Sequence, residues 1–155
     1  MYWTRLTTPG SISSAGMDGS SPLRLITGLG APYGLTIDHS SQRLFWTDYT
    51  RNNIQSSDVD EQDVQLVLEF PSGSNPWGIT VLKGRIYWVN DGNNMLQSAT
   101  KDGQDVQTLY TETNGMRQII IAPAVNQPTN RTNDCAGRSC SKLYVLAPAS
   151  YRCLA

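Results

Sequence analysis

The chain has 155 residues, a formal net charge of −1 and only 16% charged residues, against about 25% in a typical soluble domain. It has no basic cluster, so the electrostatic footprint of a nucleic-acid-binding protein is missing. No apolar run approaches the roughly 20 residues needed to cross a bilayer, and no secretion signal is recognisable at the N-terminus. Ser, Thr, Asn, Gln and Gly are plentiful, which favours a protein of strands and turns.

An internal repeat organises most of the chain. Three positions recur at a spacing of 42 or 43 residues: Trp3, Trp46 and Trp88; Ile12, Ile54 and Leu96; Asp18, Asp60 and Asp102. The turn Pro32-Tyr33-Gly34 recurs as Pro76-Trp77-Gly78. Self-similarity at such a period is typical of repeat architectures in which each unit is one supersecondary structure.

Each repeat is predicted to contain four short antiparallel strands. In chain order, the units cover residues 1–29, 30–73 and 74–113, and a closing strand follows at 115–122. Apolar residues alternate over short segments, as at 35–38, and Gly, Pro, Asn, Asp and Ser separate these segments. This pattern predicts an all-β fold of β-propeller blades, in which the repeated apolar residues form the core.

The polar residues give little indication of catalysis. Asp38 and Asp48 are interpreted as turn residues and as hydrogen-bond acceptors between blades. The single histidine, His39, is predicted to be a solvated turn residue. The spacing of Cys135 and Cys140, without a neighbouring histidine, favours disulfide chemistry over zinc. We therefore predict no enzymatic activity, no cofactor and no metal site.

The aromatic-Trp strands resemble a known repeat. Phe45-Trp46-Thr47-Asp48, with its counterparts Tyr2-Trp3-Thr4 and Tyr87-Trp88-Val89-Asn90, resembles the class B or YWTD repeat of the low-density-lipoprotein-receptor family. The resemblance implies a six-bladed β-propeller, of which this chain would be a fragment of about three blades. It also implies that Asp48 bridges adjacent blades, with Asn90 as a neutral substitute in the next repeat. An unclosed arc of blades would leave unpaired edge strands, so marginal stability or aggregation is expected.

The tail differs from the body because it contains all three cysteines. The resemblance implies a linker at 126–134 and a truncated epidermal-growth-factor-like module at 135–155. Within that module Cys140 and Cys153 would form a disulfide bond. Cys135 would be unpaired, because Tyr144 stands where the family has its third cysteine. Asn130 begins an acceptor sequence for N-linked glycosylation.

Large side chains beside the Pro-x-Gly turns are the main candidates for recognition. Tyr33 and Trp77 precede innermost strands, and Met116 is expected at the same place in the closing unit. Aromatic and Met side chains in loops on a rigid scaffold are suited to anchoring a peptide or protein ligand. Alternatively, Tyr33 and Trp77 only plug the central mouth of the propeller. Secondary candidates just beyond the Trp strands are Tyr49, Asn90 and Asp91.

The resemblance therefore implies the ligand-binding or ligand-releasing region of a lipoprotein-receptor-related cell-surface receptor, of the endocytic or the Wnt co-receptor type. The full-length parent would be membrane-anchored, with this region on the extracellular face of the plasma membrane. Its ligand would be an apolipoprotein, a Wnt or Wnt antagonist, or a matrix protein. The alternative is a secreted basement-membrane propeller of the nidogen type. A lactonase-like enzyme would need acidic and amide side chains around a central metal, and the sequence disfavours it.

Overall fold

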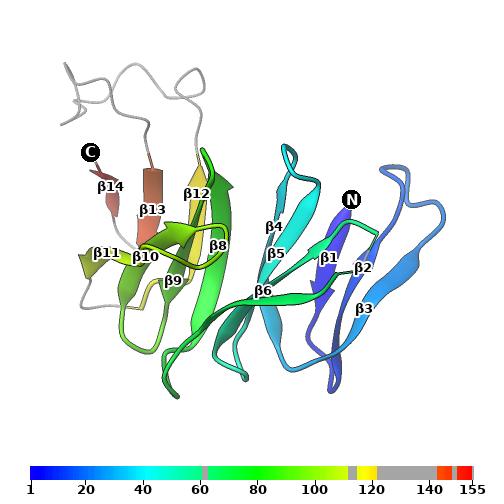
Figure 1. Ribbon diagram of the computed structural model, residues 1–155, viewed down its shortest axis with the longest axis horizontal. Helices are drawn as coiled ribbons and strands as arrows, with labels where there is room; N and C mark the ends of the chain where they lie inside the picture. The colour runs from blue at the N-terminus through cyan, green and yellow to red at the C-terminus, as the bar shows by residue number, and fades with distance from the viewer. Residues whose placement is uncertain (61–62, 112–114, 122–142, 148–149, 155) are drawn as a thin grey trace.

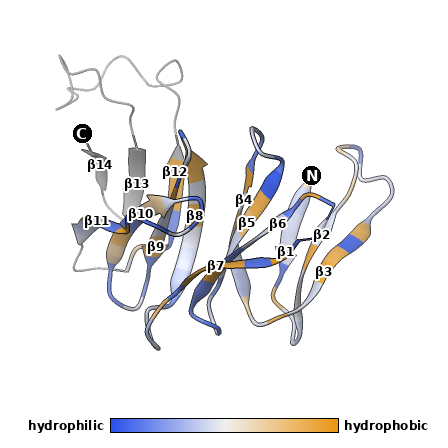
Figure 2. Ribbon diagram, in the orientation of Figure 1, coloured by the Kyte–Doolittle hydropathy of each residue, from blue (hydrophilic) through white to orange (hydrophobic). Residues whose placement is uncertain are grey.

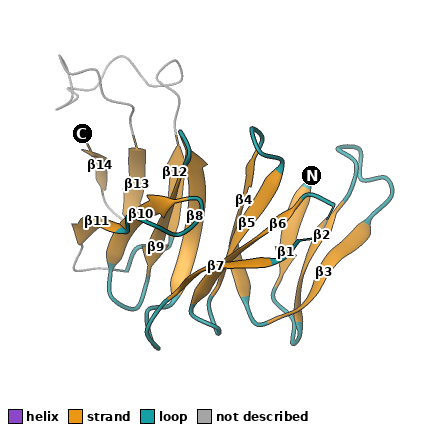
Figure 3. Ribbon diagram, in the orientation of Figure 1, coloured by secondary structure: helices purple, strands orange, loops and turns teal. Residues whose placement is uncertain are grey.

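A computed structural model of the chain describes residues 1–60, 63–111, 115–121, 143–147 and 150–154 (Figure 1). The described residues form antiparallel sheets joined by loops, and no helix occurs among them (Figure 3). This part of the chain accordingly contains no helix that is long and apolar enough to cross a membrane. The predicted all-β fold is confirmed.

The strands group into sheets in which the spatial order follows the chain order. The first sheet contains β1 (Tyr2–Arg5), β2 (Gly10–Ser14) and β3 (Leu23–Leu29). The second contains β4 (Pro32–Asp38), β5 (Arg43–Asp48), β6 (Asn53–Asp58) and β7 (Gln65–Glu69). The third contains β8 (Pro76–Leu82), β9 (Arg85–Asn90), β10 (Met95–Thr100) and β11 (Gln107–Thr111). Sequential strands pair, so each of these sheets is a meander of the kind found in propeller blades.

A fourth group joins the closing strand to the tail. It contains β12 (Gln118–Ile121), β13 (Leu143–Ala147) and β14 (Ser150–Leu154), with Ile119 opposite Val145. The division of the chain into a propeller and a separate module did not anticipate this pairing. The linker at 126–134, Asn130, Cys135 and Cys140 lie outside the described residues. The glycan, the disulfide bond between Cys140 and Cys153, and the unpaired thiol therefore remain predictions.

The sheets lie side by side, and their innermost strands are neighbours (Figure 1). Strand β4 contacts both β1 and β8, and β8 contacts β12. The second and third sheets therefore each present one face to the preceding sheet and the other face to the following sheet. This arrangement is the radial packing expected of propeller blades.

Three hydrophobic clusters fill the spaces between successive sheets. Ile12, Ile26 and Leu29 of the first sheet pack with Leu44 and Trp46 of the second. Phe45 and Ile54 of the second sheet pack with Ile79, Ile86, Trp88 and Ala99 of the third. Val89 and Leu96 of the third pack with Met116 and Ile119. Hydrophobic residues accordingly lie mainly in the strands (Figure 2).

The repeated apolar residues occupy these clusters, as predicted. The side chains of Trp46, Trp88, Ile12, Ile54 and Leu96 are all fully buried. Trp3 belongs to the same series, but it is 39% exposed in β1. The spacing of 42 residues thus marks positions that pack one sheet against the next.

Candidate functional site

Two β-bulges place Tyr33 and Trp77 at the same point of neighbouring innermost strands. The register of β4 against β5 shifts between residues 32 and 35, so Tyr33 and Gly34 lie opposite Thr47 alone. The same shift occurs in β8 against β9 between residues 76 and 79, around Trp77. A bulge bends its strand and changes the direction of a side chain, which is why bulges often occur beside functional sites.

Thr47 lies opposite the bulge in β4, and its side chain connects the second and third sheets. The backbone N–H of Gly34 donates to Thr47 Oγ1 at 2.9 Å. The hydroxyl of Thr47 in turn donates to the carbonyl oxygen of Trp77 at 2.5 Å. The extra residue of a bulge has no regular partner in the ladder. A single hydroxyl therefore satisfies the bulge in β4 and holds β8 beside it.

Two glycines allow the innermost strands to approach closely. A Cβ atom on Gly34 would lie 2.3 Å from the carbonyl oxygen of Trp77. A Cβ atom on Gly78 would lie 2.8 Å from the carbonyl oxygen of Arg117. Any larger residue at either position would push the neighbouring backbone away. The glycines thus bring residues 33, 77 and 117 into one row across β4, β8 and the start of β12.

Tyr33, Tyr49 and Trp77 form an aromatic cluster, and each ring is half-buried. The centroids of Tyr33 and Trp77 are 4.1 Å apart, with the ring planes tilted by 31°. Tyr49 meets both rings edge-on, at 5.3 Å from Tyr33 and 5.5 Å from Trp77. Offset and edge-to-face pairs of this kind are favourable beyond their buried area. The packing gives the three rings fixed positions at the surface.

Arg117 extends the row on the other side of Trp77. Its guanidinium carbon lies 5.0 Å from the centroid of the Trp77 ring, within the range of a cation–π contact. Its Nε atom lies 3.6 Å from Asp91 Oδ1. Asp91 stands 42 residues after Tyr49 in the chain. The site is therefore aromatic at one end and charged at the other.

The sequence prediction for Met116 was wrong. Gly34 faces the carbonyl oxygen of Trp77 and the amide of Ile79, whereas Gly78 faces the corresponding atoms of Arg117 and Ile119. Arg117 is thus the structural counterpart of Trp77. A shift of one residue along a strand moves a side chain to the opposite face. Met116 is consequently 1% exposed and packs in the core instead of joining the row.

Asp48 and Asn90 end equivalent strands but make different contacts. Asp48 Oδ2 accepts the N–H of Gly30 at 2.7 Å, and its Oδ1 accepts that of Ala31 at 3.0 Å. These amides lie in the segment between the first and second sheets, which is where the predicted bridging role would operate. Asn90 donates to Gln97 within its own sheet, and its buried Oδ1 atom has no partner in the described structure. Asn90 is 1% exposed, which removes it from the surface candidates.

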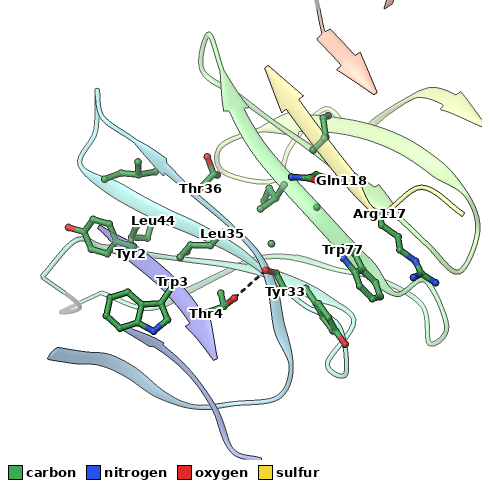
Figure 4. A pocket seen from close by; sticks show the side chains of 15 residues that line it. Tyr2, Trp3, Thr4, Tyr33, Leu35, Thr36, Leu44, Trp77, Arg117 and Gln118 are labelled. Carbon is green, nitrogen blue, oxygen red and sulfur yellow. Dashed lines mark hydrogen bonds between the residues drawn. The ribbon is translucent and has the colours of Figure 1, made fainter. Parts of the chain in front are cut away.

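The row borders an open groove of about 740 Å³. Figure 4 shows Tyr33, Trp77 and Arg117 along this groove, with the hydroxyl of Thr4 donating to the carbonyl oxygen of Tyr33 at 3.4 Å. Residues of β1, β4, β5, β8 and β12 also line it. Arg117 is the one charged residue among those that line the groove.

Sequence reasoning missed a repeated polar network on the outer parts of the sheets. Arg43 contacts Asp63 Oδ2 at 3.1 Å, and Arg85 contacts Asp105 Oδ2 at 2.7 Å. Both pairs are separated by 20 residues, and the second lies 42 residues after the first. The same comparison of registers that found the tryptophans could have found them. They contribute to the sheets and lie apart from the aromatic cluster.

Asp38 is a buried carboxylate that forms an ion pair with Lys101. Burial favours its neutral form, but Lys101 and the hydroxyls of Ser40 and Ser41 outweigh burial and hold its pKa well below the ordinary value. Lys101 Nζ lies 2.5 Å from Asp38 Oδ2 and belongs to the next sheet. The expected role as an acceptor between blades is confirmed. The part of the chain that the structure describes holds no group of three or more His, Cys, Asp or Glu residues suited to a metal ion.

Comparison with solved structures identifies the architecture. The chain is similar to a protein in a nidogen/laminin complex, with a TM-score of 0.73 and 23% identity, over 94% of this chain and 51% of that chain. It is also similar to a gluconolactonase from Xanthomonas campestris, with a TM-score of 0.66 and 18% identity, over 96% of this chain and 44% of that chain. At these identities the likeness concerns the fold alone. The described body consists of β-propeller blades.

Comparison with curated sequences gives the type of repeat. Human low-density lipoprotein receptor-related protein 5 is 39% identical over 70 residues, which cover 44% of this chain and 4% of that protein. The vitellogenin receptor of Solenopsis invicta is 33% identical over 87 residues, covering 55% of this chain and 5% of that receptor. No family model matches the chain. Together with the fold, these relatives identify the blades as class B repeats of the low-density-lipoprotein-receptor type.

Proposed function

We propose that the aromatic cluster of Tyr33, Tyr49 and Trp77 is part of a surface that binds an extracellular protein ligand. The observation that carries this proposal is the position of the rings. They project from two bulges and a neighbouring loop and remain half-exposed, and two of them, Tyr33 and Trp77, line an open groove. Rigid aromatic side chains with little entropy to lose are typical anchors in protein interfaces.

The relatives support a receptor as the parent protein. The sequence matches are to a lipoprotein-receptor-related protein and a vitellogenin receptor. We infer a cell-surface receptor of the endocytic or Wnt co-receptor type, anchored in the membrane, with this region outside the cell. Its ligand would be an apolipoprotein, a Wnt or Wnt antagonist, or a matrix protein. The chain spans only 4% to 5% of these relatives, so this assignment goes beyond the matched repeats.

A second candidate is a propeller of the nidogen type. The likeness to a protein solved in a nidogen/laminin complex supports it at the level of the fold, with a TM-score of 0.73 against 0.66 for the gluconolactonase. Both candidates use the propeller for recognition and neither requires catalysis. The enzymes among the structural neighbours, such as the gluconolactonase, share the fold at 18% identity or a similar level and give no support for a catalytic role.

Binding measurements on the purified chain test the proposal. Lipoprotein particles, a Wnt antagonist and laminin would each be immobilised, and the dissociation constant measured for the wild type and for the Tyr33→Ala and Trp77→Ala variants. At least one probe should bind, and Trp77→Ala should weaken that binding by about tenfold or more, as at an interface hot spot. The identity of the probe separates the receptor type from the nidogen type.

A matched control removes an apolar side chain elsewhere. Leu23 is 58% exposed on β3, away from the groove, and Leu23→Ala should bind like the wild type. Thermal unfolding of each variant checks that it is folded. If the folded Tyr33→Ala and Trp77→Ala proteins bind every probe normally, the cluster serves only to pack the innermost strands.

A further inference from the structure

We infer that Arg117 is a specificity-determining residue, which makes the surface select ligand segments that carry a carboxylate next to an apolar side chain. This inference rests on the proposed function, because it names the chemistry of the ligand for the same surface. Four observations support it: the charge of the groove, the exposure of Arg117, its fixed position, and the nature of its partner.

The groove itself has a single sign of charge. Arg117 is the one charged residue in its lining, and no carboxylate lines it. The remaining lining consists of aromatic, aliphatic, glycine, threonine and glutamine residues. A ligand that buries an unpaired cation here would face like charge without compensation, whereas a carboxylate would find a partner. Charge complementarity therefore favours an acidic segment.

Arg117 is both available and held in place. Its side chain is 66% exposed, so its donors face solvent. The guanidinium lies over the Trp77 ring, whose other side faces Tyr33. A guanidinium has five N–H donors in a planar fork that matches a carboxylate. Because the stack fixes the fork beforehand, less side-chain entropy is lost when a carboxylate binds.

The partner of Arg117 leaves room for an external carboxylate. The ion-pair contact of Asp91 is to the Nε atom of Arg117, at 3.6 Å, which is longer than a normal hydrogen bond. Asp91 is 19% exposed and lies outside the groove lining. It partly neutralises Arg117 and orients it, while the exposed side chain of Arg117 stays accessible to a ligand. Asp91 thus competes weakly with the carboxylate of the ligand.

The aromatic end and the charged end of the row together define the chemistry of the ligand. Tyr49 follows β5 of the second sheet and contacts both Tyr33 and Trp77. Its equivalent after β9 of the third sheet is Asp91. An apolar side chain of the ligand would pack on the three rings, and a carboxylate one or two residues away would reach Arg117. Contacts at both ends of the row would fix the orientation of the ligand as well as raise its affinity.

Selection from a library of random dodecapeptides displayed on phage tests this inference. The wild-type chain, Arg117→Gln, Asp91→Asn and Trp77→Ala would each be immobilised and the enriched sequences compared. The wild type should enrich peptides with Asp or Glu beside an apolar residue. Arg117→Gln should enrich peptides that keep the apolar residue and lose the acidic one. Asp91→Asn should strengthen the acidic preference, since Arg117 then has no internal competitor.

Synthetic peptides from the wild-type selection give the quantitative test. Each acidic peptide is compared with its amide counterpart, Asp to Asn or Glu to Gln, by isothermal titration. The wild type should prefer the acidic form by roughly fivefold, as for an exposed ion pair, and added salt should reduce this preference. Arg117→Gln should abolish it. Arg24→Gln, which removes an exposed arginine of β3 far from the groove, should retain it.

The outcomes separate the inference from the function on which it rests. If Arg117→Gln retains the acidic preference while Trp77→Ala loses binding, the surface binds ligands but Arg117 does not select them. If the wild type enriches no peptide beyond those that Trp77→Ala enriches, the binding surface itself is wrong. Unfolding curves for all five proteins, Arg24→Gln included, show whether a lost preference comes from a lost fold.

Discussion

The hydroxyl of Thr47 is a single group that contacts two sheets at once. It accepts a hydrogen bond from Gly34 in β4 and donates one to the carbonyl oxygen of Trp77 in β8. The equivalent residue of the third sheet is Val89, which has no hydroxyl and cannot make such a bond to the next strand. The same position in the repeat is therefore polar and bridging in the first two copies, at Thr4 and Thr47, and apolar in the third.

Replacing Thr47 by valine, which has the same shape, should show how much these two hydrogen bonds contribute to the stability of the protein. The change leaves the N–H of Gly34 and the carbonyl of Trp77 without their partner, and Thr47 is fully buried. We expect the free energy of unfolding to fall by about 1–3 kcal/mol, measured by urea denaturation. Thr47→Ser keeps the hydroxyl and should lose much less. Equal losses for the two variants would mean that the methyl group matters and the hydrogen bonds do not.

Other single residues were predictable to different degrees. The repeat predicted that Tyr33 and Trp77 occupy equivalent places, and the structure brings them into contact. It did not reveal the role of Arg117, because the closing strand lacks the Pro-x-Gly signal that marks the other two turns. Without that signal, the register of 115–121 against β8 was ambiguous by one residue. That single residue decides whether Met116 or Arg117 faces the groove.

At the level of the strands, the distance between neighbours depends on glycine. Gly34 and Gly78 face the backbone of the next innermost strand, where a Cβ atom would overlap with carbonyl oxygens. A contact with backbone cannot be relieved by rotating a side chain. The Pro-x-Gly signature in the sequence thus encodes both the bulge and the close approach of β4 to β8.

Gly34→Ala should separate these two strands. A Cβ atom 2.3 Å from the Trp77 carbonyl oxygen forces β8 away, so the unfolding free energy should fall by about 2–3 kcal/mol and the contact between Tyr33 and Trp77 should weaken. Chemical denaturation followed by near-ultraviolet circular dichroism measures both effects. Gly19→Ala is the control: its Cβ would lie in open space at a φ of +83°, so it should cost only about 1 kcal/mol and leave the aromatic signal intact.

The positions of the strands themselves followed from the sequence. Alternating apolar residues and turn signals predicted the elements of the second and third sheets, and the structure has four strands in each. The hairpin of β13 and β14, which pairs with β12, was not predicted as part of that sheet. Local patterns indicate that a segment is a strand, but they do not indicate its partner when the connecting segment is long.

For the molecule as a whole, the sheets are joined by contacts between residues far apart in the chain. Three hydrophobic clusters lie between successive sheets. The ion pair of Lys101 with Asp38 adds a polar link between the second and third sheets, across 63 residues of sequence. Asp38 is nearly buried, so this link is shielded from solvent more than a surface pair would be.

Acid should weaken the link between these two sheets. The folded-state pKa of Asp38 lies below its ordinary value of 3.8, so the carboxylate stabilises the folded protein fully at neutral pH. This contribution is lost as the pH falls below about 4 towards the folded-state pKa. Asp38→Asn should lower the unfolding free energy at pH 7 by on the order of 2 kcal/mol and flatten its decline in acid.

Two further variants complete that measurement. Lys101→Met removes the ammonium, so the folded-state pKa of Asp38 should rise towards its ordinary value. The loss of stability still begins below about pH 4, but it should be smaller and should level off at a higher pH than in the wild type. Arg24→Gln removes an exposed charge of β3 and should leave the acid limb of the stability curve unchanged. Parallel acid limbs for Lys101→Met and the wild type would contradict the link.

The sequence by itself determined the class of fold, the period of the repeat and the residues that fill the core, because hydrophobic alternation and turn chemistry are local properties that a chain carries in its order. The tertiary structure alone decided that Tyr33, Trp77 and Arg117 form one row and that Asp91 faces Arg117. Those contacts depend on the registers of separate sheets and on how closely their inner strands approach. Glycine, a bulge and a one-residue shift set these distances, and their combined effect exists only after the sheets have packed.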